Sequence, residues 1–185
     1  MTFSPKLGKF ILTSHITFSV GWFGAVAVFL AFAITGVTSQ DVLLARSAYL
    51  AMEVSGWFVI VPLCLASLLT GIIQALGTKW GLFKHYWIIV KLVLTIASTI
   101  VLLFHMKPIS YLADLATQNA FTINDHFTLK LQLIADAGAA LLVLLAITTI
   151  SIYQPWGKVQ SISKNKEFKK QTPGKTPFRK SWKLY

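Results

Sequence analysis

Four long apolar stretches, almost free of charged residues, constrain what this chain can fold into. They cover residues 10–40, 54–78, 85–106 and 137–157, and the one charged residue inside them is Lys91. Each stretch supplies the roughly 20 apolar residues that cross about 30 Å of hydrocarbon. The first is too long for the apolar part of a secretory signal, which runs about 7–15 residues. The sequence therefore predicts an all-α, polytopic membrane protein with four transmembrane helices.

The composition agrees with lipid as the solvent. Only 12% of the 185 residues are charged and 55% are hydrophobic, whereas soluble domains average about 25% charged residues. The single cysteine, Cys64, excludes an intramolecular disulfide. We expect a transmembrane domain over residues 1–157, followed by a basic tail over residues 158–185.

Capping residues and prolines predict the helix boundaries. Ser39 is a candidate cap for the second helix, and Pro62 predicts a bend within it. Pro108 should end the third helix, because proline cannot continue the backbone hydrogen bonds, and residues 111–125 then form a long outer loop. The predicted helices, packed as a four-helix bundle, cover residues 12–37, 42–77, 82–106 and 125–153.

The basic residues are divided unevenly between the two ends of such a bundle. With the N-terminus in the cytoplasm, thirteen of the 17 Lys and Arg residues lie on the cytoplasmic side, and five of the six acidic residues lie on the opposite half. The positive-inside rule then places both termini in the cytoplasm. The tail is expected to contact anionic membrane lipid. Nucleic acid is not an expected partner, because the tail has no recognised nucleic-acid-binding motif.

The four histidines lie at or near the ends of the apolar stretches. His15 and His85 belong to the cytoplasmic half, and His105 and His126 belong to the outer half. Two imidazoles on different helices at one membrane surface are what bis-histidine ligation of a b-type haem needs, and a bundle interior shields the macrocycle from water. The alternative is that each histidine is an interfacial side chain with hydrogen bonds and no ligand.

Helical geometry favours one haem over two. His85 and His105 are twenty residues apart, about 30 Å along a helix axis, and twenty steps of about 100° turn them to nearly opposite sides. We predict that His15 and His85 are the metal ligands, with His105 and His126 as a second, weaker pair. Met106 beside that outer pair leaves copper handling as an alternative there.

Lys91 lies about two turns inside the third apolar stretch, where a charge costs roughly 2.5–3.5 kcal/mol. One interpretation is that its ammonium reaches back to the membrane surface. The other is that Lys91 binds the cofactor, as a counter-charge for a haem propionate or an anionic lipid head, or as a direct ligand. Thr95, Ser98 and His105 share its helix face, which is expected to point into the bundle.

Acidic residues near the outer surface are candidate partners of the outer histidines. Glu53 is predicted to hydrogen-bond His105 or His126 and so fix the tautomer of the ring. Asp136 is expected to pair with Lys130 in the fourth helix, although six residues is not an ideal helical spacing.

Several of these residues form a pattern found in known membrane proteins. The quoted segments are Leu68-Leu-Thr-Gly71, then Gly77-Thr-Lys-Trp-Gly-Leu-Phe-Lys-His85-Tyr-Trp-Ile-Ile-Val-Lys91-Leu and His105, with His15 and Val20-Gly-Trp-Phe-Gly24 in the first helix. Over about half of the chain, this pattern resembles a group of small bacterial membrane proteins. The group includes the copper-resistance D-type proteins and the membrane protoporphyrinogen oxidase that binds b-type haem.

The resemblance implies a bacterial inner-membrane protein with a haem. In the oxidase, a first-helix histidine is paired with a lysine after the short turn, and His15 and Lys91 match those positions. The chain lacks the Pro-Arg-rich segment that follows the first helix of the oxidase.

Three functions therefore remain. The leading hypothesis is b-type haem binding in one-electron transfer, with a redox partner or a second copy of the chain as protein partner. The second is a non-catalytic membrane subunit or scaffold whose tail docks a partner or lipid, and the third is copper handling. The sequence assigns no catalytic residue, because it has no phosphate-binding loop, nucleophile elbow, paired-cysteine site or HExxH motif.

Overall fold

The computed structural model describes residues 3–77, 85–118 and 126–153, which are helical apart from short connections and contain no strand. The elements in chain order are α1 (Pro5–Thr38), α2 (Val42–Ser55), the π-helix η1 (Gly56–Ile60), α3 (Val61–Gly77), α4 (Tyr86–Thr117) and α5 (Phe127–Tyr153). Because α2, η1 and α3 follow without a break, the chain has four helices long and apolar enough to cross a membrane. The predicted all-α, multi-pass membrane fold is confirmed.

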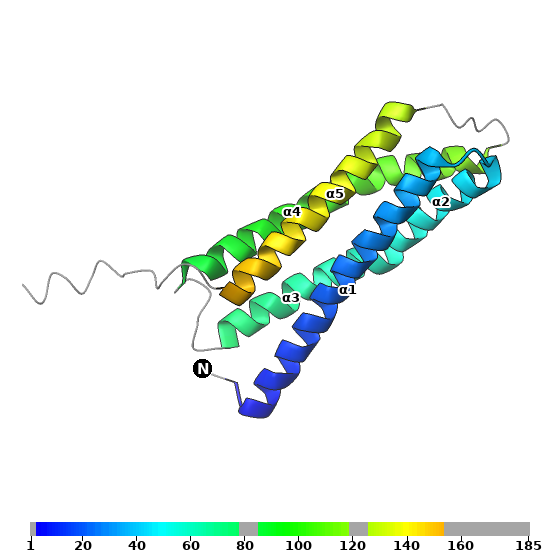
Figure 1. Ribbon diagram of the computed structural model, residues 1–185. Coiled ribbons are helices and arrows are strands. Elements are labelled where there is room, and N and C mark those ends of the chain that lie inside the picture. The colour runs from blue at the N-terminus through cyan, green and yellow to red at the C-terminus, as the bar shows by residue number, and fades with distance from the viewer. Residues whose placement is uncertain (1–2, 78–84, 119–125, 154–185) are drawn as a thin grey trace, which may run out of the picture.

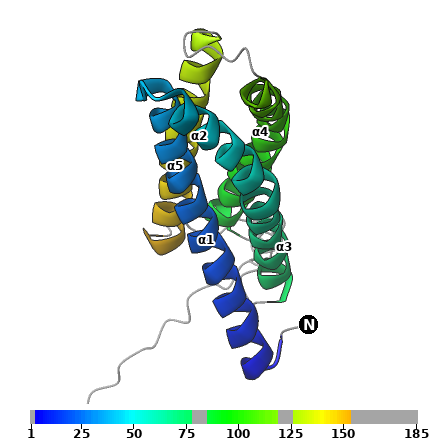
Figure 2. The same cartoon turned by 90° about the vertical axis from the view of Figure 1, so that its right-hand side faces the viewer.

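The four spans run up and down and form an elongated bundle (Figures 1 and 2). The span made by α2, η1 and α3 packs against α1 on one side and α4 on the other, and α5 packs against both α1 and α4. α1 and α4 are thus diagonal to each other. The beginnings of α1 and α4 lie at the same end of the bundle as the ends of α3 and α5 (Figure 1). We call this end the inner end.

The first two helices begin at capped positions. Ser4 accepts a hydrogen bond from the Leu7 amide at 3.4 Å, and Pro5 occupies the first turn, where its missing N–H is not needed. Asp41 caps α2, because its carboxylate accepts the Leu43 amide at 2.8 Å. Ser39 was the predicted cap of this helix, but its amide instead bonds the Thr35 carbonyl and ends α1.

The second span is irregular where Pro62 enters it. The five residues before Val61 form a π-helix, and the Val61 amide bonds the carbonyl of Gly56. A proline ring clashes with the carbonyl four residues earlier, and a π-turn moves that carbonyl aside. A π-helix thus directly precedes the segment that contains Pro62, where the sequence predicts a bend.

The third span continues past Pro108, which contradicts the prediction that this residue ends it. α4 extends to Thr117, and four of the residues that follow the proline are buried. These residues are Ile109, Leu112, Ala113 and Ala116. Their burial against neighbouring helices outweighs the one hydrogen bond that a proline removes, which costs about 3 kcal/mol. The predicted outer loop is correspondingly shorter at its beginning.

α5 follows a histidine with a left-handed backbone. His126 has φ of 56°, and its carbonyl accepts the Lys130 amide at 3.1 Å. The residues that directly precede His126 lie outside the described residues, as does the basic tail.

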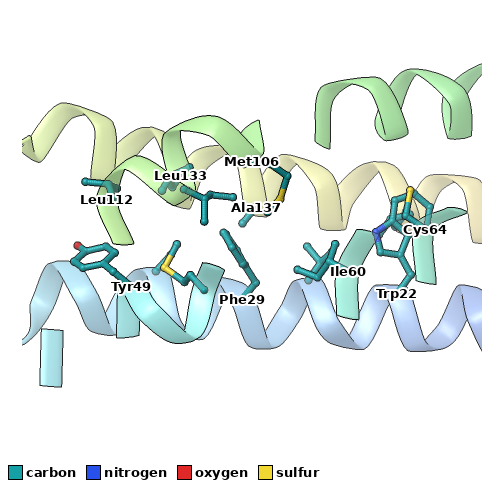
Figure 3. Close-up of a cluster of buried hydrophobic side chains, with 14 of the residues drawn as sticks. Trp22, Phe29, Tyr49, Ile60, Cys64, Met106, Leu112, Leu133 and Ala137 are labelled. Atoms are coloured by element: carbon teal, nitrogen blue, oxygen red, sulfur yellow. The ribbon is translucent and has the colours of Figure 1, made fainter. Parts of the chain in front are cut away.

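A continuous apolar core runs along the bundle. Figure 3 shows it from Tyr49 and Leu112 at one end, through Phe29 and Met106, to Trp22 near the other end. Gly36 lies directly against the Tyr49 ring, since a Cβ at Gly36 would be 2.7 Å from the Tyr49 Cζ. Many large apolar side chains outside this core are exposed on the bundle surface. In a membrane they face lipid, and packing rather than water exclusion holds the helices together.

Candidate functional site

A polar cluster lies inside the inner half of the bundle, and all four spans contribute to it. We call it the inner cluster. His15 and Ser19 of α1 are hydrogen-bonded to α3, and Lys91 of α4 is hydrogen-bonded to Ser151 of α5. The members of the inner cluster are His15, Ser19, Ser67, Thr70, Lys91 and Ser151.

The protonation of the His15 ring follows from its neighbours. Nδ1 lies 3.1 Å from the Ser67 carbonyl oxygen and 3.2 Å from the Thr70 hydroxyl oxygen. The Thr70 hydroxyl already donates to the Ala66 carbonyl at 2.6 Å. Because a carbonyl only accepts, Nδ1 carries the hydrogen, and Nε2 is left with its lone pair. His15 makes no hydrogen bond through Nε2 to the described residues.

Local packing holds this ring in place. Gly71 lies beneath it, and a Cβ at Gly71 would be 3.0 Å from Cε1 of His15. One turn along α1, the Ser19 hydroxyl is 2.8 Å from the Ser67 hydroxyl and ties the same two helices together. Small residues on α3 thus allow α1 to come close enough for the imidazole to reach a backbone carbonyl.

Lys91 enters the same region from the diagonal helix. Its Nζ donates to the Ser151 hydroxyl at 2.7 Å and lies 5.8 Å from the centre of the Trp87 ring. The Lys91 charge also interacts electrostatically with His15. The predicted inward orientation of the Lys91 face is thereby seen, with the ammonium directed back toward the inner end.

His85, the other predicted inner ligand, lies closer to the inner end than His15. It is 7% exposed, directly precedes α4, and its ring centre is 6.2 Å from that of Trp87. His15 instead contacts residues seven to ten positions before the end of α3, which is about 10–15 Å along the helix. No hydrogen bond or ring contact joins the two imidazoles, so the structure does not bring this predicted pair together.

The described residues can be compared with what a metal ion and a haem each require. Among residues 3–77, 85–118 and 126–153, no three or more His, Cys, Asp or Glu side chains form a group that could hold a metal ion. A porphyrin supplies four nitrogen ligands itself and needs one or two from the protein. An imidazole with Nδ1 bonded to a carbonyl and Nε2 free is the arrangement found in metal-ligating histidines.

The outer half of the bundle contains a second polar contact, between α4 and α5. Nε2 of His105 lies 2.8 Å from a carboxylate oxygen of Asp136, and Nδ1 lies 2.7 Å from the Val101 carbonyl oxygen. Both ring nitrogens are therefore engaged. Asp136 was expected to pair with Lys130, but Lys130 is instead buried with its Nζ 5.3 Å from the centre of the Tyr49 ring.

The predicted outer pair of ligands is not assembled in this geometry. His126 lies beside Tyr111, with ring centres 5.4 Å apart, rather than beside His105. Glu53 is half-buried and makes no side-chain hydrogen bond or ion pair to either histidine. The geometry thus gives no support to the copper hypothesis or to the expected role of Glu53.

We expect the His105–Asp136 contact to couple α4 to α5 modestly. The two side chains are 25% and 36% exposed, and polar contacts between membrane helices contribute about 0.6 kcal/mol on average and up to about 1.7. A double-mutant cycle with His105→Gln and Asp136→Asn, read by unfolding in mild detergent, should give a coupling free energy of about 1 kcal/mol. Strict additivity of the two substitutions would show that the contact is not made.

The sequence analysis did not identify four of the cluster residues as site residues, namely Ser19, Ser67, Thr70 and Ser151. Their hydroxyl and carbonyl groups matter because of the register between helices, which no local pattern encodes. A helical projection does place Ser67 and Gly71 on one face of α3. This shared face was the one sequence feature that pointed to a close contact with a neighbouring helix.

Comparison with known proteins found no relative of this chain. No protein-family model matches the chain, and no match is found among curated proteins or among solved structures.

Proposed function

We propose that this chain is a b-type haem-binding membrane protein that takes part in one-electron transfer. The observation that carries the proposal is the hydrogen bonding of the His15 ring. Its Nδ1 hydrogen is held by the Ser67 carbonyl, and its Nε2 makes no hydrogen bond to the described residues. Bound haem would supply a one-electron redox couple, whose potential is set by its axial ligands and by burial.

His15 is the first ligand in this proposal, and His85 and Lys91 are the other cofactor-binding residues. His85 is the predicted second ligand. It lies at the beginning of α4, next to Trp87 and six residues before Lys91. Ligation by both histidines would require an approach of His85 and His15, since they lie at different depths in this structure.

We also propose a bacterial inner-membrane location with both termini in the cytoplasm. The support is the distribution of basic residues, thirteen of 17 on one side, under the positive-inside rule. A cysteine placed at Thr117 in a Cys64→Ala background should react with an impermeant thiol reagent added to intact cells, while a C-terminal tag stays protected from protease. If the cysteine at Thr117 did not react and the tag were cleaved, the orientation would be the opposite of the one proposed.

An absorption spectrum tests the haem proposal. Full-length protein purified in mild detergent from haem-replete cells should show a Soret band, and reduction should produce an α-band. A preparation without pigment or iron would instead favour the second hypothesis, a non-catalytic subunit or scaffold that uses its basic tail to dock lipid or a partner.

A further inference from the structure

Lys91 is a membrane-embedded cation for which the described residues provide no carboxylate. Its ammonium contacts one neutral hydroxyl, that of Ser151 at 2.7 Å, and one aromatic face, that of Trp87. Both contacts orient the charge without neutralising it. An unneutralised charge at this depth is unfavourable, so the arrangement points to an anion that is supplied from outside the transmembrane helices.

The sequence explains why this anion is not found within the domain. No acidic residue occurs between Glu53 and Asp114, and the acids of the other spans belong to the outer half. Asp136, the acid within α5, contacts His105 in that outer half. Glu167 in the tail is the single acidic side chain on the predicted cytoplasmic side.

We propose that the inner cluster binds an amphipathic ligand whose carboxylate or phosphate group pairs with Lys91. The Ser151 hydroxyl accepts from Lys91 and keeps its own hydrogen to donate to the same anion. The ammonium is directed toward the inner end, where an acidic group meets the membrane surface, and His15 contacts α3 seven to ten residues before that end. An acidic group at Lys91 would thus leave the apolar body of the ligand nearer to His15.

Two sources share this chemistry, namely a haem propionate and an anionic lipid headgroup. The haem form of the proposal rests on the proposed function and adds to it that Lys91 recognises the propionates of the haem. The lipid case does not need haem. The two are separated by testing each with its own probe.

The first arm compares hemin with its dimethyl ester, which has the same ring without free carboxylates. Full-length protein, produced without pigment and placed in phosphatidylcholine nanodiscs, would be titrated with each compound. Wild-type protein should bind hemin about tenfold more tightly than the ester, as expected for one charge-assisted hydrogen bond. Lys91→Met should abolish this preference, and Lys91→Arg should retain it because the cation remains.

Lys107→Met is the matched control. Lys107 is an exposed lysine on the same helix and has no place in the inner cluster, so its replacement should leave the hemin preference unchanged. Equal binding of hemin and ester by the wild type, or an unchanged preference in Lys91→Met, overturns the haem form of the proposal.

The second experiment uses vesicles that contain phosphatidylglycerol and tests the lipid form of the proposal. If neither hemin nor its ester binds, the proposed haem function fails, and this experiment still tests whether Lys91 binds an acidic group. Wild-type protein extracted from these vesicles should retain phosphatidylglycerol by native mass spectrometry, and Lys91→Met should retain several-fold less. Equal retention by the two proteins overturns the proposal.

Discussion

Replacing His15 with alanine is expected to lower the haem bound per protein at least tenfold. The substitution removes an imidazole whose Nδ1 is oriented by a backbone carbonyl and whose Nε2 makes no hydrogen bond to the described residues. A haem that loses an axial ligand loses a coordinate bond that hydrogen bonds cannot replace. The measurement is the ratio of Soret to protein absorbance for variants purified in parallel.

The matched control for this prediction is His126→Ala. His126 is an exposed residue before α5 and lies beside Tyr111, outside the inner cluster. Its replacement should leave the pigment ratio unchanged. A His15→Ala protein that elutes as the wild type does and keeps its full Soret band would rule out His15 as a ligand. His85→Ala is expected to lower the ratio as well if the two histidines approach when haem binds.

The second large effect concerns packing, and we expect Gly36→Leu to destabilise the bundle by about 3 kcal/mol. A Cβ at Gly36 would be 2.7 Å from Cζ and 2.9 Å from the hydroxyl oxygen of Tyr49, whose ring is 2% exposed. Overpacking of a filled core costs about 1–3 kcal/mol, occasionally more, and the three further carbons of leucine add to the clash. The midpoint of thermal unfolding in detergent should fall accordingly.

Gly24→Leu is the control for the packing prediction. Gly24 lies in the same helix, and a Cβ there would meet no atom within 4 Å. Leucine at this position should leave the midpoint unchanged or raise it, because leucine favours a helix more than glycine does. Equal effects of leucine at the two positions would contradict the contact between Gly36 and Tyr49.

The sequence is informative about the spans because hydropathy is a local property. Long uncharged apolar stretches must be helices in lipid, where every backbone polar group needs a partner within its own segment. The same reasoning failed at Pro108, where local chemistry predicts an end to the helix. Leu112 and Ala116 are buried beyond it, and that burial depends on neighbouring helices which the local sequence does not describe.

The candidate site was partly predictable for a similar reason. The cost of a charge in hydrocarbon singled out Lys91, and the position of His15 near a helix end singled out that histidine. Their partners depend on how one helix is aligned with another. The Ser67 carbonyl opposite His15 and the Asp136 carboxylate opposite His105 follow from interhelical register, and a shift of one turn, about 5.4 Å, would have changed both.

The central claim is that the bundle binds haem through His15, and haem content per protein tests it most directly. Full-length wild-type protein and His15→Ala, each purified in mild detergent from haem-replete cells, would be assayed for iron by elemental analysis and for pigment by absorbance before and after reduction. We predict about one haem per wild-type chain, since the helical geometry favours one haem rather than two, and little in the variant. A wild-type protein free of iron and pigment would contradict the account.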